Sequence, residues 1–256
     1  MIYDTHIHTS FSHDSQMDIE AVITKMDQLG MGVILTEHID LNYPDPLSFN
    51  LDVAAYFKRY RQFRSARLLL GVEVGMGVED VSVNRRLTEN HPFDFVLGSI
   101  HVVDNADIYD EGANTIKTKK QLYDRYFDAM IECLKVYDFI DSLGHIDYIS
   151  RYARYADREI YHEEFADRID QIFRLLIENQ ICLEINTRRL GDRGAVESLK
   201  LIYKRYRDLG GQYVTIGSDA HIPGDIGKNF AAAFEIAEQC NLKPVWFKER
   251  RMEYAL

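Results

Sequence analysis

Histidines lie close together near the start of this chain, in the run Asp4-Thr5-His6-Ile7-His8. His6 and His8 are two residues apart, and on an extended strand side chains at that spacing point to the same side. Two imidazoles on one side can hold one metal ion between them. Asp219 and His221 repeat the same spacing far along the chain. Both pairs therefore predict metal ligands.

Further polar residues stand where short apolar runs end. Seven of the nine histidines fall at these ends. The residues concerned are Asp4 to His8 with His13, Thr36-Glu37-His38, Glu73, Gly98-Ser99-Ile100-His101, Gly144-His145-Ile146-Asp147, Glu184-Ile185-Asn186 and Gly217 to His221. A lone histidine in such a place is more often a hydrogen-bonded structural residue than a ligand. Independent structural roles would not all favour the same ends, so the set as a whole predicts a metal site.

Imidazole nitrogens combined with carboxylate oxygens suit Zn²⁺, Mn²⁺ or Fe²⁺, and the set is too rich in imidazole for Ca²⁺ or Mg²⁺. The candidate ligands are His6, His8, His13, His38, Glu73, His101, His145, Asp219 and His221. These nine residues exceed what one ion can hold, so two or three divalent ions are expected. Glu73 lies among apolar residues, where a carboxylate without a partner would be costly, and it is expected to bridge two ions.

Four other histidine, glutamate and aspartate residues are not counted among the candidate metal ligands. Glu37 and Asp147 are equally consistent with orienting a neighbouring imidazole and with ordinary hydrogen bonding at a strand end. His91 precedes a proline and His162 opens a helical segment, so both are expected to be solvated. The chain has no Gly-rich phosphate loop of the Walker or Rossmann type and no Gly-x-Ser-x-Gly motif. The sequence therefore favours metal chemistry.

The elements that position these residues alternate along the chain. Short apolar runs, typical of buried parallel strands, occupy residues 2–4, 32–36, 68–74, 93–100, 139–143, 181–185 and 213–217, with a weaker run at 244–247. Helix-period segments occupy residues 18–29, 51–64, 119–136, 161–179, 195–209 and 229–239, and Asp18 is expected to cap the first. No linker interrupts the order, which predicts one α/β barrel with its site at the C-terminal strand ends. An open doubly wound sheet is the alternative that periodicity leaves open.

The net charge of the chain indicates which kinds of molecule it can bind. The formal net charge of the 256 residues is −11, which disfavours a nucleic-acid partner but allows a local basic pocket. Arginines follow two of the predicted strands, as Arg151 and Arg154 after His145 and as Arg188, Arg189 and Arg193 after Asn186. Arginines at the mouth of a barrel can hold a phosphate group by paired hydrogen bonds, although loop arginines are usually solvated. A small phosphorylated substrate is therefore expected.

The cellular location is predicted from what the sequence lacks. The N-terminal residues do not form a secretory signal, and no apolar run approaches the roughly 20 residues that span a bilayer. Cys133, Cys182 and Cys240 are widely spaced and odd in number, which suits buried thiols in a reducing compartment. A cytoplasmic location without a membrane partner is expected, and the oligomeric state is left open.

Taken together, these motifs resemble those of the polymerase-and-histidinol-phosphatase (PHP) family. The matching motifs are Asp-x-His-x-His, Glu-His, Gly-x-Glu, Gly-Ser-x-His, Gly-His-x-Asp and Ser-Asp-Ala-His, between Asp4 and His221. The chain length and the run from Gly98 to Asp104 are most similar to the stand-alone histidinol-phosphate phosphatases of that family. The resemblance implies a distorted (β/α)7 TIM-like barrel, with residues 1–256 forming a single PHP-type phosphoesterase domain.

The resemblance also implies a trinuclear metal site. By that resemblance the first metal would bind His6, His8, Glu73 and Asp219, the second Glu73, His101 and His145, and the third His13, His38 and His221. The loops at residues 39–46 and 186–190 depart from the phosphatase pattern. These departures concern the substrate rather than the chemistry.

The activity that the resemblance implies is histidinol-phosphatase activity in histidine biosynthesis. A hydroxide activated at the multinuclear metal site would hydrolyse L-histidinol phosphate to L-histidinol and phosphate. The expected catalytic residues are Glu73, Asp219 and His221. Arg154 and Arg188, together with Arg151, are the expected phosphate contacts. Asp40, with Asn42 and Asp45, is expected to receive the cationic amino or imidazole group, although an ordinary polar loop is an equally good interpretation of those three residues.

Two alternatives remain at this point. The first is a PHP phosphoesterase acting on another small phosphate ester, a nucleotide or a 3′ end, although the acidic balance argues against a polymer. The second is a metal-binding or regulatory module without turnover. Retention of every expected ligand argues against the second alternative.

Overall fold

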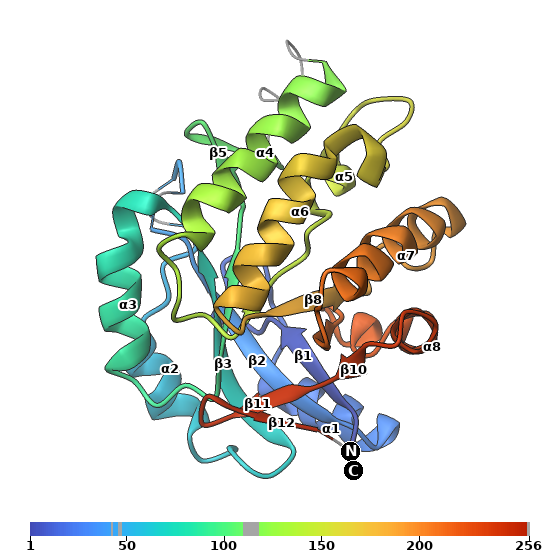
Figure 1. Ribbon diagram of the computed structural model, residues 1–256. Helices are drawn as coiled ribbons and strands as arrows, with labels where there is room; N and C mark the ends of the chain where they lie inside the picture. The colour runs from blue at the N-terminus through green and yellow to red at the C-terminus, as the bar shows by residue number, and fades with distance from the viewer. Residues whose placement is uncertain (42, 46–47, 110–117, 255–256) are drawn as a thin grey trace.

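A curled parallel sheet forms the centre of the molecule (Figure 1). The computed structural model describes residues 1–41, 43–45, 48–109 and 118–254. The strands, in their order across the sheet, are β1 (Tyr3–Ile7), β2 (Gly32–Ile39), β3 (Leu68–Gly75), β4 (Phe95–Ser99), β7 (Ser142–Leu143), β8 (Cys182–Asn186), β9 (Tyr213–Gly217) and β10 (Lys243–Pro244). All neighbouring pairs are parallel, and each predicted apolar run contributes a strand.

The sheet curls until its first and seventh strands meet. A parallel bridge joins Ile7 to Ala220, and the backbone N–H of His8 donates to the carbonyl of Ala220 at 2.9 Å. The N–H of Asp219 donates in return to the carbonyl of His6 at 2.8 Å. At the other end of β9, Tyr213 pairs with the short strand β10. The distorted TIM-like barrel is therefore confirmed, and the open doubly wound alternative is wrong.

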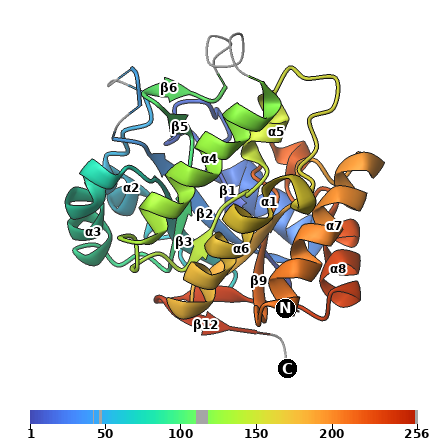
Figure 2. The ribbon, with the colours of Figure 1, turned by 45° about the horizontal axis from the view of Figure 1, so that its top comes forward.

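Helices surround the sheet (Figures 1 and 2). They are α1 (Ile19–Leu29), α2 (Val53–Tyr60), α3 (Val81–Glu89), α4 (Lys119–Leu134), α5 (Tyr148–Tyr152), α6 (His162–Glu178), α7 (Arg193–Asp208) and α8 (Phe230–Gln239). Short 3₁₀ turns lie at η1 (Val78–Asp80) and η3 (Pro223–Asp225). Two antiparallel hairpins, β5 (Val102–Val103) with β6 (Ala106–Asp107) and β11 (Trp246–Lys248) with β12 (Arg251–Glu253), complete the described elements. No helix of the described residues is long and apolar enough to cross a membrane.

Two helices were not predicted, for different reasons. The buried side chains of α3 are Asn84 and Thr88, so this helix shows no apolar period in the sequence. The Asn84 side chain instead donates to the carbonyl of Gly75 and to the Tyr137 hydroxyl. The other helix, α5, is only five residues long. Asp18 occupies the N-cap position of α1, but its side chain makes no capping hydrogen bond, so that part of the prediction is wrong.

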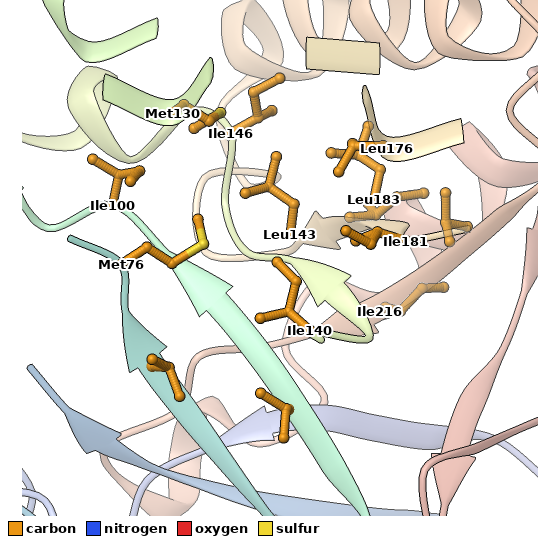
Figure 3. Packing of buried hydrophobic residues seen from close by; sticks show 14 of the residues in the cluster. Met76, Ile100, Met130, Ile140, Leu143, Ile146, Leu176, Ile181, Leu183 and Ile216 are labelled. Atoms are coloured by element: carbon orange, nitrogen blue, oxygen red, sulfur yellow. The ribbon is translucent and has the colours of Figure 1, made fainter. Parts of the chain in front are cut away.

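The hydrophobic core fills the space between strands and helices. Figure 3 shows Leu143 of β7 and Leu183 of β8 among neighbouring apolar side chains, and both are fully buried. Burial of one such side chain contributes about 1.5–3 kcal/mol to the free energy of unfolding. The three cysteines are free and buried, as predicted. This packing holds the strands rigidly, and therefore fixes the polar residues at their C-terminal ends.

Candidate metal centre

A cavity of about 630 Å³ opens at the C-terminal ends of the strands. The N-terminus and the hairpin of β11 and β12 lie at the opposite end of the barrel, away from β5 and α5 (Figure 1). The cavity lining includes the following predicted site residues: His13, His38, Asp40, His101, His145, Arg151, Arg188, Asp219 and His221. The barrel thus gathers residues from both halves of the chain in one place.

Glu73 lies at the centre of the candidate site and is fully buried. Its Oε1 atom lies 2.9 Å from Nε2 of His145 and 3.3 Å from Nε2 of His101. Its Oε2 atom lies 3.1 Å from Nε2 of His6 and 3.3 Å from Nε2 of His8. Burial by itself raises the pKa of Glu73, but the surrounding imidazoles, His6 first, bring that pKa well below its ordinary value. Nδ1 of His38 also lies 3.1 Å from Oε2. Each oxygen of this carboxylate therefore faces its own group of imidazoles, as a bridging ligand would.

A third group of potential ligands lies beside the first two. The His8 ring stacks on His38 and on His221, with ring centroids 4.2 and 4.3 Å apart. Nε2 of His221 lies 2.8 Å from Oδ2 of Asp14, and Nε2 of His38 lies 3.7 Å from the same oxygen. Burial, followed by the charges of His38 and His221, brings the pKa of His8 well below its ordinary value. A neutral imidazole is the form that binds a metal ion.

Hydrogen bonds from Nδ1 of two rings aim the Nε2 atoms of these rings inward. Nδ1 of His6 donates to Glu184 at 2.8 Å, and Nδ1 of His101 donates to Asp40 at 2.8 Å. The Nε2 atoms of His6 and His8 lie only 3.0 Å apart, which suits two lone pairs that converge on one cation. An imidazole with its second nitrogen tied to a carboxylate is the usual arrangement of a metal-ligating histidine. The donor set therefore fits divalent metal ions.

The structure gathers eight of the nine candidate ligands. Groups of three, whose ligand atoms lie within 4.8 Å of one another, are His8 with His38 and His221, His6 with His145 and Asp219, His6 with His8 and Glu73, and Glu73 with His101 and His145. A further group joins Asp40 to His38 and His101. The eight candidates come from six strand ends.

His13 is the exception among the nine, because the structure does not bring it together with the other candidate ligands. Its side chain is exposed at the cavity rim, with its ring 5.7 Å from that of Phe49 in a T-shaped contact. It belongs to none of the ligand groups of the described residues. The loop after β1 turns the next residue, Asp14, toward His221 and His38 instead.

Asp40 contacts two of the candidate ligands. Its Oδ1 atom accepts from His101, while Oδ2 lies 3.5 Å from Nδ1 of His38. Burial raises the pKa of Asp40, but His101 and His38 bring that pKa down to about 2. A Cβ atom at Gly75 would lie 1.7 Å from Oδ1 of Asp40, so glycine makes room for this carboxylate. Asp40 therefore orients two imidazoles while it also lines the cavity. Asn42, expected beside it, lies outside the described residues.

Glu184 is one of the polar strand-end residues of the sequence, but no role was predicted for it. Its Oε1 atom accepts from His6, and its Oε2 atom accepts from the backbone N–H of His145 at 2.7 Å and from Asn186 at 3.1 Å. The side chain is fully buried. The available signal was a glutamate inside the apolar run 181–185, where an unpartnered charge would be costly.

The roles of Glu37 and Asp147, left open by the sequence, differ from each other. The Ser12 hydroxyl donates to Glu37 at 2.6 Å and can therefore only accept from Nδ1 of His8, 3.1 Å away. Glu37 thus orients His8 through Ser12. Asp147 instead forms an ion pair with Arg189, at 3.2 Å.

Two of the three expected phosphate-binding arginines line the cavity. Arg151 is paired with the carboxylate of Asp219. Arg188 donates to the backbone carbonyl of Asp219 at 2.8 Å, and its residue is exposed. Arg154 is exposed and lines a separate surface hollow with Arg158, so it does not face the candidate metal centre. The loop after α5 directs Arg154 away from the cavity, which makes it a poor phosphate contact.

Known proteins resemble this chain over its whole length. The PHP domain model matches residues 4–188. A probable histidinol-phosphatase of Clostridium acetobutylicum is 49% identical over 255 residues, covering 100% of both chains. A histidinol-phosphatase of Lactococcus lactis is 29% identical over 86% of this chain and 84% of its own length. A crystal structure of histidinol phosphate phosphatase from Lactococcus lactis, complexed with zinc, L-histidinol and phosphate, superposes with a TM-score of 0.93 at 26% identity, covering 98% of each chain. The chain therefore belongs to the PHP domain family.

Proposed function

We propose that this protein is a histidinol-phosphatase, a metal-dependent hydrolase that converts L-histidinol phosphate to L-histidinol and phosphate. The observation that supports this most directly is the buried Glu73 carboxylate, whose two oxygens face separate groups of imidazoles. The full-length relative of Clostridium acetobutylicum and the crystal structure with bound zinc, L-histidinol and phosphate support the choice of substrate.

The residues that would hold two or three divalent ions (Zn, Mn or Fe) are His6, His8, His38, Glu73, His101, His145, Asp219 and His221. Zinc is the ion in the crystal structure of the Lactococcus lactis protein. Such ions, when bound, lower the pKa of water and neutralise charge on a phosphoryl group.

The chain's own residues have distinct tasks in the proposed hydrolysis. The Arg188 guanidinium is exposed to the cavity beside the candidate metal centre, where it would hold phosphate oxygens. Arg151 fixes the Asp219 carboxylate by an ion pair and also lines the cavity. Asp14 and His221 face each other at the edge of the cluster, with Nε2 and Oδ2 2.8 Å apart. This pair would hold either a third ion or the proton that the leaving alkoxide takes up.

A phosphate-release assay tests the proposal. L-Histidinol phosphate would be compared with nucleoside monophosphates in the presence of added Mn²⁺ or Zn²⁺, and L-histidinol phosphate is expected to be the preferred substrate. Turnover of a different ester alone would instead identify the second candidate, a PHP phosphoesterase with another small substrate. The expected role in histidine biosynthesis stands or falls with the preference for L-histidinol phosphate, whereas the cytoplasmic location is a separate expectation.

A further inference from the structure

A buried carboxylate outside the candidate metal centre also faces the cavity. Asp107 ends β6 and is only 6% exposed. The Tyr43 hydroxyl donates to its Oδ2 atom at 2.6 Å, and the backbone N–H of Tyr109 donates to its Oδ1 atom at 2.9 Å. Both donors are neutral, and no lysine, arginine or histidine of the described residues pairs with it. A buried negative charge without a cation is unfavourable for folding, so a different role must account for it.

Aromatic side chains surround this carboxylate at the cavity rim. Tyr43 packs edge to face on Phe49, with ring centroids 4.5 Å apart, and Tyr109 packs in the same way on Tyr152, at 5.0 Å. These four rings line the same cavity as Asp107. Aromatic faces attract cations and pack well against flat rings. Together with one carboxylate, they suit a flat ligand group that bears an N–H donor.

Arg188, the candidate phosphate contact, lies on another side of the cavity. Tyr43 follows β2, whereas Arg188 follows β8. In the sheet these strands are separated by β3, β4 and β7 in one direction and by β1 and β9 in the other. The candidate metal ligands lie between the two sides. A ligand with phosphate at one end and a flat cationic group at the other therefore matches the polarity of the cavity.

We propose that Asp107 and the surrounding aromatic side chains form the subsite for the imidazole ring of the substrate. A ring N–H donates to Asp107 while the ring face lies against the tyrosines. This inference rests on the proposed function and names the residues that select the substrate at that same site. It also replaces the sequence-based expectation for Asp40, whose oxygens face His101 and His38.

The variant Asp107→Asn tests the subsite, because asparagine keeps the shape and an acceptor oxygen but loses the charge. Two substrates would be compared: L-histidinol phosphate and L-phenylalaninol phosphate, which has the same ammonium and phosphate groups but no ring N–H. For L-histidinol phosphate kcat/KM is expected to fall about 10- to 100-fold, mainly through KM. For L-phenylalaninol phosphate the change is expected to stay below about twofold, since no hydrogen bond to the ring is lost.

Asp104→Asn is the matched control. Asp104 lies in the turn of the same hairpin, pairs with Arg125 at 2.6 Å and does not line the cavity. Its loss of charge is screened by solvent, so kcat/KM for both esters is expected to change less than about twofold. The wild-type protein offers a further test that needs no variant. It is expected to prefer L-histidinol phosphate over L-phenylalaninol phosphate by roughly tenfold or more in kcat/KM.

Each other outcome contradicts a defined part of the inference. Equal losses on both esters in Asp107→Asn would assign Asp107 to the ammonium group and overturn the imidazole subsite. Unchanged kinetics on both esters, or equal use of the two esters by the wild type, would show that Asp107 does not select the substrate. These results test the subsite only if the wild-type protein hydrolyses L-histidinol phosphate. Its failure to do so, with turnover of another ester, would overturn the proposed function and the subsite together.

Discussion

Glu184 accepts a hydrogen bond from Nδ1 of His6 at 2.8 Å, and this bond turns Nε2 of His6 toward Glu73. The second oxygen of Glu184 accepts from the backbone N–H of His145. One buried carboxylate thus orients one candidate ligand and fixes the backbone of another. Neither contact is evident from the sequence, since Glu184 and His6 are 178 residues apart.

The first prediction concerns the replacement of Glu184 by glutamine. In Glu184→Gln the amide NH₂ group cannot accept a hydrogen bond, so either His6 or the backbone of His145 loses its partner. Metal affinity or activity is expected to fall about 10- to 100-fold, as when other orienting partners of ligating histidines are lost. Metal titration and kcat/KM measure the effect. The exposed residue Glu197 provides the control Glu197→Gln, and equal metal affinities in the two variants would contradict the orienting role.

Among the substitutions considered, replacement of Glu73 is expected to have the largest effect on metal content and activity. Glu73→Gln removes the charge that five imidazoles share, so metal content and phosphatase activity should disappear together. Elemental analysis of reconstituted protein measures the metal, with more than one ion per chain expected for the wild type. A fully active variant would contradict the bridging role. Fewer than about one ion per wild-type chain would contradict a multinuclear site.

Gly75 is predicted to be intolerant of a side chain. Its alanine Cβ would meet Oδ1 of Asp40 at 1.7 Å, so Asp40 must move and His101 would lose its acceptor. Gly75→Ala is expected to lower activity by about 10-fold or more. The control Gly224→Ala places its Cβ in open space, and its free energy of unfolding should change by less than about 0.5 kcal/mol. Normal activity in Gly75→Ala would show that Asp40 does not need its present position.

The two arginines Arg188 and Arg154 should behave differently. Arg188 lines the cavity, so Arg188→Ala is expected to raise KM for the phosphate ester about 10- to 100-fold through loss of a charged hydrogen bond. Arg154 lines a separate hollow, so Arg154→Ala should change KM by less than about twofold. Steady-state kinetics with L-histidinol phosphate measures KM for both variants. A larger increase in KM for Arg154→Ala than for Arg188→Ala would instead identify Arg154 as the phosphate contact.

A pH-dependent contribution to stability is predicted away from the cavity. Asp170 on α6 accepts from Nε of Arg205 at 2.8 Å and from Nε2 of His162 at 2.9 Å. Its hydrogen bonds with Arg205, opposed by burial and supported by His162, lower its pKa from 3.8 to about 2. Because the pKa is lower in the folded state, this stabilisation is complete above pH 3.8 and is lost as the pH falls through 2.

The variant Asp170→Asn measures this contribution. At pH 7 it is expected to lower the free energy of unfolding by about 1–3 kcal/mol, and this difference should shrink as the pH falls below 4. Urea denaturation at several pH values provides the measurement. Asp167→Asn, at an exposed position of the same helix, is the control. A difference that stays constant down to pH 2 would contradict the ionic origin of the effect.

The sequence by itself determined the strands of the barrel and most of the candidate ligands. Buried parallel strands must be apolar throughout, so they are visible as short runs, and polar residues stand out where the runs end. The spacing of His6 and His8 follows from the two-residue period of a strand. Parallel strands with helical connections then bring their C-terminal ends together, which is why residues as distant as Glu73 and Asp219 could be assigned to one site.

Only the tertiary structure decided which loop residues face the cavity. The Ser15 hydroxyl bonds to the backbone carbonyls of His8 and His221, and the latter lies 206 residues away. Such contacts fix the loop after β1, so that Asp14 faces the ligands and His13 does not. The orientations of Arg154 and Asp107 depend in the same way on loop conformation. No short sequence period encodes a loop, because its shape follows from hydrogen bonds to distant residues rather than from its own repeating pattern.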